Sequence, residues 1–385
     1  MVNMALKTKS PVHIGSGNKY SLMDAYVEDG RLIRVNMDSV FRENPELTKE
    51  YIRALDEKNL TKIRKILKNG EKRYTIDLKG GIISRLEEKI LECVKDSAGD
   101  VPYIPGSTVK GYIRTALIVK YLKDNEWNFD ISVNGQLKRY DFWNAIQNGV
   151  PEINIKALMR DGEDRKPKTF GRRFENLVVF VGNIKINKRR YDAKYDIFKF
   201  LLVSDFYPQN YRMHVDTLKI KNVRRTASQI LETVEGTFHG EIELDRGILT
   251  AVRDRKEYPA LREKLKMLGL SYEDLGDMEK AERKMIAHIR WAMREYLQDA
   301  IKYEREKLRK SIKYPEESNM RIGFGTGFLY KTLWVYIIKN LPERYASQIL
   351  RNISRGRGYI HTYPKSLRML SNDVSLGWCL LEEKK

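Results

Sequence analysis

The sequence predicts an α+β fold, and three observations support this class. Short runs of β-branched and aromatic residues alternate with longer stretches whose apolar residues recur at helical spacing. Glycine-bearing turns separate these runs. The chain has 385 residues, which is enough for two domains that each bury a core. We place the domains at residues 1–230 and 231–385.

The N-terminal half is predicted to open with a strand at residues 3–14. The pair Asp29-Gly30 then joins two short strand patterns and is typical of a hairpin turn. The polar, basic segment 160–176 predicts a loop. The expected helices of this half lie at residues 36–68, 82–96 and 107–124.

The C-terminal half repeats the pattern of strands followed by helices. Its long helix shows apolar positions such as Met285, Ile289 and Met293 at helical spacing. Its expected strands begin at Val234 and lie at 375–381, and its expected helices lie at 257–268 and 276–311. The strands expected at residues 177–186 and 197–206 precede it and belong to the N-terminal half. Two ferredoxin-like (RRM-like) βαββαβ units with helical insertions and glycine-rich loops fit this order.

Charge restricts the class of partner. The chain carries 72 Lys and Arg against 52 Asp and Glu, a formal charge of +20, which favours polyanions. There is no apolar run of membrane-spanning length and no signal-peptide pattern, so we expect a cytoplasmic protein with nucleic acid, not a membrane, as partner. Cys93 and Cys379 stand far apart without metal-ligand spacing, so we expect two buried thiols, no metal and no cofactor.

Three segments share glycines, hydroxyls and cations: "HIGSGNKY", "IPGSTVKGYIR" and "RIGFGTGFLYK". Glycine exposes backbone N–H groups, and a following helix adds the positive end of its dipole, so phosphate suits such a segment. Neither a Walker A motif nor GxGxxG is present, which argues against nucleotide cofactors. The alternative is that each segment is only a tight turn. The candidate RNA-binding residues are His13, Gly15, Ser16, Gly17, Lys19, Gly106, Ser107, Thr108, Lys110, Arg114, Arg321, Gly323, Gly325, Gly327 and Lys331.

The second segment is the most informative because its helix carries Lys110 and Arg114 one turn apart. Ser107 can cap this helix without any ligand. A cap does not explain two like charges on one face, which cost a few tenths of a kcal/mol unless an anion lies between them. We therefore favour a phosphate contact at this segment.

Two further basic segments suit single-stranded RNA. Cations that alternate with tyrosines near residues 351–368 offer charge together with rings on which bases stack. The alternative for both segments is an ordinary basic surface. The candidates here are Arg355, Arg357 and Lys365, with Arg172 and Arg173 in the predicted loop.

His13 is the residue that an enzyme would use. A metal-independent ribonuclease needs a general acid or base, and His13 precedes the first glycine segment. Packing or RNA contact is the alternative, which we favour. No HExxH, DxD or paired acidic cluster is present, so we expect no catalytic residues.

The ordered set of motifs resembles the RAMP superfamily of CRISPR-associated RNA-binding proteins. The resemblance rests on "TKSPVHIGSGNKYSLMDAYVEDGRLIRVN", "YIPGSTVKGYIRTAL", "ETVEGTFHGEIELD", "RIGFGTGFLYKTL" and the ending "YPKSLRML…LGWCLL". Within the superfamily it is strongest for the family of the fifth Csm subunit of type III-A effector complexes. That family implies tandem ferredoxin-like domains whose glycine-rich loops contact the crRNA backbone.

The resemblance implies a function. It indicates a non-catalytic subunit that binds the 3′ portion of the single-stranded crRNA, caps that side of the Csm complex, and supports crRNA maturation and assembly in antiviral defence. The implied partners are the backbone RAMP subunit, the small helical subunit and a host trimming nuclease. The alternatives are a repeat-processing, metal-independent endoribonuclease that uses His13, the RAMP subunit that holds the crRNA 5′ handle, and a scaffold that contacts only proteins.

Overall fold

The structure is a computed structural model of the chain. It describes all residues except 43, 80–82, 84–85, 149, 151–169, 185–191, 222–227, 309–313, 328, 348–366, 371–372 and 385, and the side chains of 170–174, 221, 308 and 367 also lie outside the description. The described residues form a mixed α+β fold, which confirms the predicted class.

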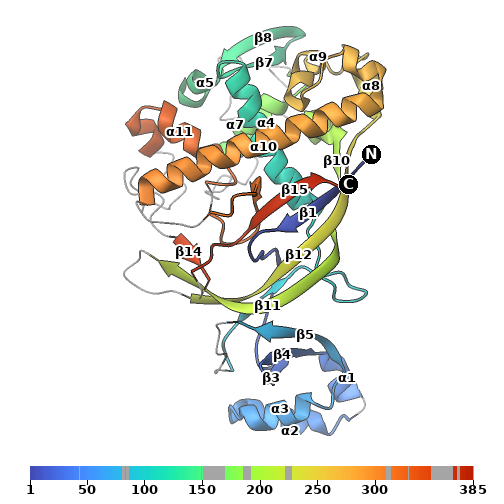
Figure 1. Cartoon of the computed structure of the whole chain (residues 1–385), viewed down its shortest axis with the longest axis vertical. Coiled ribbons are helices and arrows are strands. Elements are labelled where there is room, and N and C mark those ends of the chain that lie inside the picture. Colours follow the sequence, from blue (N-terminus) through green and yellow to red (C-terminus); the bar gives the residue numbers. More distant parts are fainter. Residues whose placement is uncertain are drawn as a thin grey trace.

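One large mixed sheet organises the molecule (Figure 1). Its strand order is β13-β15-β1-β12-β11-β5-β4-β3, and β2, β6, β10 and β14 pair off this path. The strands are β1 (Val2–Thr8), β2 (Gly15–Tyr20), β3 (Ala25–Glu28), β4 (Arg31–Val35), β5 (Lys72–Leu78), β6 (Ile90–Cys93), β10 (Leu201–Val203), β11 (Tyr207–Lys221), β12 (Ser228–Leu244), β13 (Met320–Arg321), β14 (Leu367–Met369) and β15 (Trp378–Glu383).

The long hairpin of β11 and β12 forms the centre of this sheet. The two strands pair antiparallel from Tyr207 opposite His239 to Lys219 opposite Ser228. Gly236 allows their close approach, because a Cβ there would lie 2.1 Å from a backbone oxygen of β11. The predicted domain boundary after residue 230 falls within β12. The division into two domains stays a prediction.

Two long helices, α4 (Gly106–Asp124) and α10 (Met278–Leu308), pack against each other. Tyr112 and Tyr296 meet edge to face at this contact, with ring centroids 5.5 Å apart. The predicted apolar positions of α10 are buried, as the helical spacing indicates. In Figure 1, α10 crosses the molecule in front of α4.

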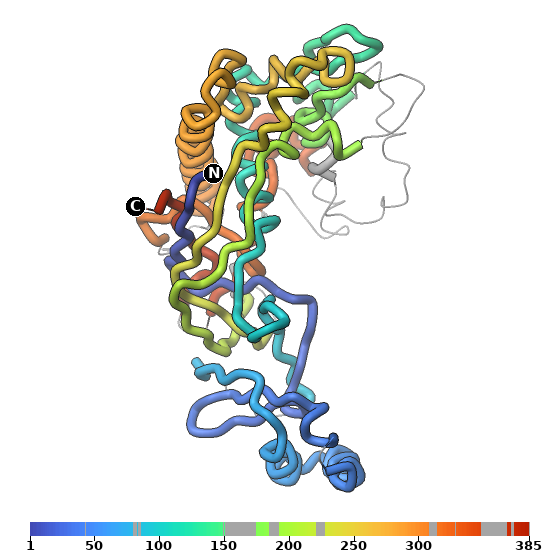
Figure 2. The backbone as a smooth tube through the Cα atoms, turned by 90° about the vertical axis from the view of Figure 1, so that its right-hand side faces the viewer, coloured from blue at the N-terminus to red at the C-terminus, as the bar shows by residue number. Residues whose placement is uncertain are grey.

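Smaller elements complete the fold. Three short strands form a second sheet in the order β8-β7-β9, and α1 to α3 lie with β3 and β4 at one end of an elongated molecule (Figure 2). The bounds are α1 (Met37–Arg42), α2 (Leu47–Asp56), α3 (Leu60–Leu67), β7 (Asn128–Val133), β8 (Gln136–Asp141), α5 (Phe142–Asn148), α7 (Phe170–Val179), β9 (Asn183–Ile184), η2 (Ala193–Tyr195), η3 (Ile197–Phe200), α8 (Gly247–Ala251), α9 (Leu261–Lys264), η4 (Leu265–Leu268), η5 (Glu273–Gly276) and α11 (Trp334–Asn340).

Most strongly patterned elements are confirmed. The hairpin turn at Asp29 and Gly30 has φ angles of 50° and 73°, as a two-residue turn requires. The helices within 36–68, the helix from 107, the long C-terminal helix and the terminal strand are also present. None of the helices that the structure describes is long and apolar enough to cross a bilayer.

The predicted helix at 82–96 is wrong, because residues 90–93 form strand β6. Ile90 and Cys93 are buried where β6 pairs with both β2 and β12. The apolar residues of this stretch also fit helical spacing, which is why the pattern misleads. Pairing with two distant strands overrides that local preference.

The predicted loop at 160–176, where the structure describes it, and the start of the predicted strand at 177–186 are wrong, because residues 170–179 form α7. Part of that strand is present as β9 (Asn183–Ile184). The last turn of α7 is stabilised from far along the chain: the buried Lys264 Nζ donates to the carbonyls of Val178 and Phe180, each at 2.7 Å. A cation that bonds the final carbonyls of a helix satisfies groups that otherwise lack partners.

Candidate nucleic-acid interface

The three predicted glycine segments, which are far apart in the sequence, meet around one pocket of about 420 Å³. β2 contributes Gly15, the start of α4 contributes Ser107 and Thr108, and the segment after β13 contributes Gly323. The full lining is Ile14, Gly15, Ser107, Thr108, Gly111, Tyr112, Arg321, Ile322, Gly323, Phe324, Tyr330 and Lys331.

The first turn of α4 presents polar groups to this pocket. Ser107 is exposed and Thr108 half-buried, so both hydroxyls border open space. The amide of Ser107 has no acceptor among the described residues, whereas the Gly106 amide donates to Asp205 at 2.7 Å. A free amide at the positive end of a 19-residue helix favours an anion.

Capping of α4 differs from the prediction. Ser107 lies inside the helix and makes no cap, and Asp205 accepts the hydrogen bond from the first amide instead. Gly106 has a packing role, because a Cβ would lie 2.3 Å from the carbonyl oxygen of Val203. The hydroxyl of Ser107 is therefore not used to hold the helix.

Gly111 is one of the lining residues that the sequence does not predict. It lies inside α4 and lines the pocket, and a Cβ there would meet no atom within 4 Å. Glycine inside a helix costs about 1 kcal/mol relative to alanine. Packing within the described chain gives no reason for glycine here, and the open space in front of it belongs to the pocket. A lone glycine in a helical pattern was the available signal.

The C-terminal glycine segment is tied to the first one. The amide of Phe324 donates to the carbonyl of His13 at 2.8 Å, and a Cβ on Gly323 would lie 2.5 Å from that same oxygen. Gly323 has a φ of 89°, which other residues rarely adopt. The exposed Lys331 donates from Nζ to the Gly323 carbonyl at 2.5 Å. These contacts hold two walls of the pocket at a set separation.

The first glycine segment forms strand β2 in place of the expected glycine break. β2 pairs with β6 through an irregularity between Gly15 and Lys19, and Gly17 has a φ of 95°. Ser16, Gly17 and Lys19 are exposed, and Lys19 makes no ion pair with a described residue. The irregularity leaves these polar groups on the surface next to the pocket wall.

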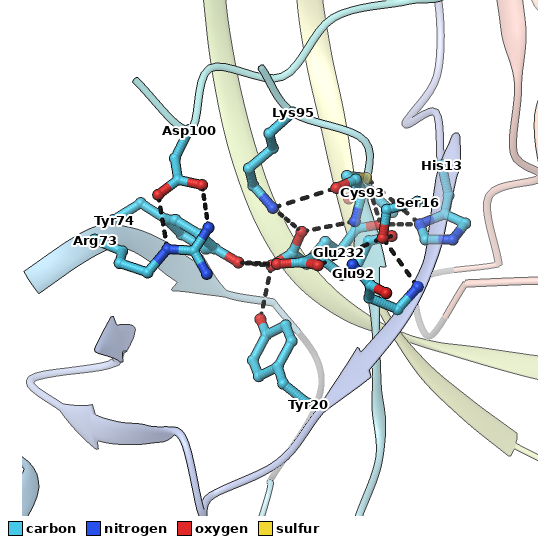
Figure 3. A network of polar contacts seen from close by, with 12 residues as sticks. His13, Ser16, Tyr20, Arg73, Tyr74, Glu92, Cys93, Lys95, Asp100 and Glu232 are labelled. Carbon is cyan, nitrogen blue, oxygen red and sulfur yellow. Dashed lines mark hydrogen bonds and ion pairs between the residues drawn. The ribbon is translucent and has the colours of Figure 1, made fainter. Parts of the chain in front are cut away.

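A buried acidic residue anchors the other side of this strand (Figure 3). Glu232 on β12 is fully buried and accepts four hydrogen bonds. They come from the Tyr20 hydroxyl at 2.7 Å, the Tyr74 hydroxyl at 3.0 Å, the Cys93 amide at 2.8 Å and Lys95 Nζ at 2.5 Å. Burial, and next the Glu232 charge, raise the pKa of Tyr20 well above its ordinary value, so this hydroxyl remains a donor.

His13 belongs to this anchor. Its Nδ1 lies 2.7 Å from the Glu232 carbonyl oxygen, which only accepts, so Nδ1 carries the proton. The ring is 2 % exposed and packs edge to face on Phe324. Burial is the main cause that lowers the pKa of His13, which keeps the ring neutral at neutral pH. These contacts favour packing over acid–base chemistry.

The two cations of the second segment have different surroundings. Arg114 donates to Glu175 and Asn176, both at 3.1 Å, and to Asp196 at 3.4 Å. Its charge is paired within the fold. Lys110 is half-buried and makes no ion pair with a described residue; burial lowers the pKa of Lys110, the Asp196 charge opposes this, and the Arg114 charge still contributes to the lowering. Lys110 precedes Gly111 and lies outside the pocket lining.

Arg321, a predicted RNA-binding residue, is buried. It is 1 % exposed, Nε donates to the Leu376 carbonyl at 3.0 Å, and its guanidinium stacks on Tyr330 and Trp378. Glu304 lies 3.6 Å from Nη1. The Arg321 guanidinium makes these contacts inside the core. We therefore exclude Arg321 from the proposed RNA contacts, and also Arg114, which is paired within the fold.

The remaining candidates are not brought into the pocket. Gly325 and Gly327 have φ angles of 82° and 83° and shape the loop beyond Gly323. Arg172 and Arg173 lie on α7, but their side chains are outside the described residues, as are Arg355, Arg357 and Lys365 entirely. Cys93 and Cys379 are buried and free, as expected. Among the described residues, no group of three or more His, Cys, Asp or Glu is placed to hold a metal ion.

The chain is similar to known CRISPR proteins along most of its length. A family model described as the RAMP superfamily matches residues 5–330. The CRISPR system Cms protein Csm5 of Methanocaldococcus jannaschii is 23% identical over 347 residues, which cover 86% of this chain and 72% of that protein.

Solved structures show the same fold. One chain of a Csm–crRNA–target RNA ternary complex of a type III-A CRISPR-Cas system has a TM-score of 0.70 and 22% identity, covering 99% of this chain and all of that one. Csm5 of T. onnurineus has a TM-score of 0.61 and 21% identity, covering 98% and 99%. The α+β architecture is thus consistent with ferredoxin-like RAMP domains, and the predicted resemblance is confirmed. The chain belongs to the RAMP superfamily.

Proposed function

We propose that this chain is a non-catalytic crRNA-binding subunit that caps the 3′-end side of a type III-A effector complex. One observation carries the proposal: three glycine segments from distant parts of the chain form the walls of one pocket beside a helix start. Superfamily membership and the similarity to Csm5 support it.

The pocket favours backbone recognition. Its open polar groups are the Ser107 amide and the hydroxyls of Ser107 and Thr108, which suit phosphate and 2′-hydroxyl groups. The Lys331 ammonium, which donates to the Gly323 carbonyl, adds positive charge to the lining. Such groups bind the sugar–phosphate backbone of any nucleotide, whatever its base. A subunit that must accept guides of varying sequence requires this lack of preference.

The partners follow from the same proposal. The chain contacts the 3′ portion of the crRNA, the backbone RAMP subunit and the small helical subunit, and it sets crRNA length by exposing the 3′ end to a trimming nuclease. The buried, neutral His13 supports a role in binding and not in cleavage.

A matched pair of variants tests the pocket. Thr108→Glu places a carboxylate in the lining at the first turn of α4, where the helix dipole tolerates it. Thr48→Glu makes the same change at an exposed position of α2. We expect the first to weaken binding of mixed-sequence single-stranded RNA about tenfold and the second to change it little. Equal binding by both variants would show that the pocket is not the RNA site.

Sequencing of crRNA 3′ ends tests the place in the complex. Complexes assembled without this chain should carry 3′ ends of altered length, and the Thr108→Glu protein should restore the ordinary ends only in part. Unchanged 3′ ends together with altered 5′ handles would assign the chain to the opposite end of the crRNA.

A further inference from the structure

The outer face of α10 is basic between its two ends, where Glu279 and Glu306 are exposed. Between residues 280 and 305, each exposed side chain of this helix is a cation, an alanine, a glutamine or Trp291. They recur three or four residues apart and so form one stripe, about 37 Å long at 1.5 Å per residue. The six exposed cations are Lys280, Arg283, Lys284, Arg294, Lys302 and Arg305.

The acidic residues of this part of α10 do not neutralise the stripe. Glu282 binds the N-terminal amine, Glu295 and Asp299 bind Lys123, and the buried Glu304 accepts from Tyr330. All four carboxylates are therefore engaged beside or beneath the stripe.

Only part of the stripe has partners within the chain. Lys284 pairs with Asp274 at 2.6 Å, and Arg305 stacks over Tyr314. Lys280, Arg283, Arg294 and Lys302 make no ion pair with a residue that the structure describes. Their charges are available to an anion outside the protein.

Trp291 lies in the middle of the stripe and is 58 % exposed. The Lys120 ammonium lies 3.8 Å from its ring centroid, and His288 approaches edge to face at 6.2 Å. The indole is thus held by contacts with two residues of its own chain while more than half of its surface remains open. A ring that is already ordered loses little conformational entropy when a flat ligand stacks on it.

We propose that the outer face of α10 is a second binding surface for single-stranded RNA. Its cations hold successive phosphates, and Trp291 stacks one base without sequence preference. This surface is separate from the glycine-loop pocket. The opposite side of α10 faces that pocket's walls, since the buried Tyr296 hydroxyl donates to the carbonyls of Leu329 and Thr332.

RNA fits the stripe better than two other anionic partners. An interfacial membrane helix needs a broad apolar face, whereas this face has one large apolar side chain. A tryptophan that anchors a protein partner inserts into a pocket, whereas this ring is held against the cation of Lys120. Both alternatives are outcomes of the test below.

The test uses the full chain and a short oligouridylate, with affinity measured over a range of salt concentrations. Arg283→Glu/Arg294→Glu should weaken binding at least tenfold and reduce the salt slope by about 1.4, at ~0.7 per phosphate contact. Arg53→Glu/Lys65→Glu is the matched control, because both residues are exposed helix cations without an ion pair to a described residue. It should bind nearly as the unmodified protein does.

Trp291 gives a separate readout. Trp291→Ala should weaken binding about tenfold without changing the salt slope. Trp291→Phe should keep most of the affinity but lose the quenching of tryptophan fluorescence that RNA causes. Circular dichroism checks that α10 still forms, which the exposure of these side chains leads us to expect.

Combination with Thr108→Glu separates the two RNA surfaces. The stripe variants should weaken binding by the same factor in that background, whether or not Thr108→Glu itself has an effect. Binding equal to the control variant's would overturn the proposal. The proposal would also be overturned if the stripe variants bound RNA normally but lost binding to another anion. Lost binding to poly-glutamate would assign the stripe to an acidic protein, and lost binding to anionic phosphatidylserine vesicles would assign it to a membrane.

Discussion

Strand β2 contributes Tyr20 to the hydrogen-bonded cluster around Glu232 and Gly15 to the pocket between the three glycine segments. The cluster and the pocket use polar groups in opposite ways. In the cluster, the buried Glu232 carboxylate accepts four hydrogen bonds, from Tyr20, Tyr74, Cys93 and Lys95. In the pocket, the Ser107 amide and hydroxyl stay open. Satisfied buried groups hold the fold, whereas open groups on a rigid frame are available to a ligand.

The same contrast occurs within one turn of α4. The Arg114 guanidinium forms ion pairs with Glu175 and Asp196, whereas the Lys110 ammonium forms no ion pair with a described residue. Identity as a cation therefore does not decide which residue contacts RNA. The position of acidic groups from other parts of the chain decides which cation is left without an ion pair.

The largest expected effect is on stability, from removal of the central carboxylate. Glu232→Ala leaves the Lys95 ammonium, only 4 % exposed, without its partner. Breaking one side of a buried ion pair costs about 3–5 kcal/mol. Denaturant unfolding measures this loss. Glu92→Ala is the control. Glu92 is half-buried, and its carboxylate accepts one hydrogen bond from Tyr74 at 3.0 Å and one long contact from Ser16. Its removal should lower the free energy of unfolding by about 1 kcal/mol. Equal losses would mean that Glu232 does not organise the cluster.

A second, smaller effect should separate the two cations of α4. Arg114→Ala should lower the free energy of unfolding by about 2 kcal/mol, because hydrogen bonds to Glu175 and Asp196 are lost. Lys110→Ala should change stability by less than about 0.5 kcal/mol but reduce the salt slope of RNA binding by about 0.7. The reverse result, a loss of stability in Lys110→Ala and a loss of salt dependence in Arg114→Ala, would contradict the predicted RNA contact of Lys110.

The third effect distinguishes a glycine kept for packing from one kept for a ligand. Gly106→Ala should destabilise the protein by about 1–3 kcal/mol, because its Cβ meets the backbone of residues 203 and 204. Gly111→Ala should stabilise it by up to about 1 kcal/mol and still weaken RNA binding. Thermal unfolding and RNA titration of both variants give the answer. Unchanged RNA affinity in Gly111→Ala would remove the ligand explanation.

The smallest effect concerns the pH dependence of the cluster. Burial holds the pKa of His13 below the ordinary 6.5, so the unfolded chain binds a proton that the folded chain resists. The stability contribution is therefore present above pH 6.5 and is lost as the pH falls below it. His13→Asn keeps a donor for the Glu232 carbonyl. In urea unfolding, its free energy of unfolding should fall less than that of the unmodified protein as the pH drops below 6.5. An identical loss in both proteins would assign it to other groups.

Local chemistry was predictable from the sequence, and long-range pairing was not. The Asp29-Gly30 turn, the α4 helix and the three glycine segments each carry their signal within a few residues. The partner of Arg114 lies 61 residues away at Glu175, and nothing local indicates it. For the same reason the sequence predicts a helix where β6 forms, since its pairing with two distant strands decides its conformation.

The walls of the pocket come from segments that the ribosome synthesises at very different times. Gly15 is made early and Gly323 late, and β1 reaches its full set of partners only when β15 pairs with it. Contacts of such sequence separation form late in folding. A growing chain therefore has the first and second glycine segments but no closed pocket. Under the proposed function, only a nearly complete chain therefore offers the closed pocket to RNA.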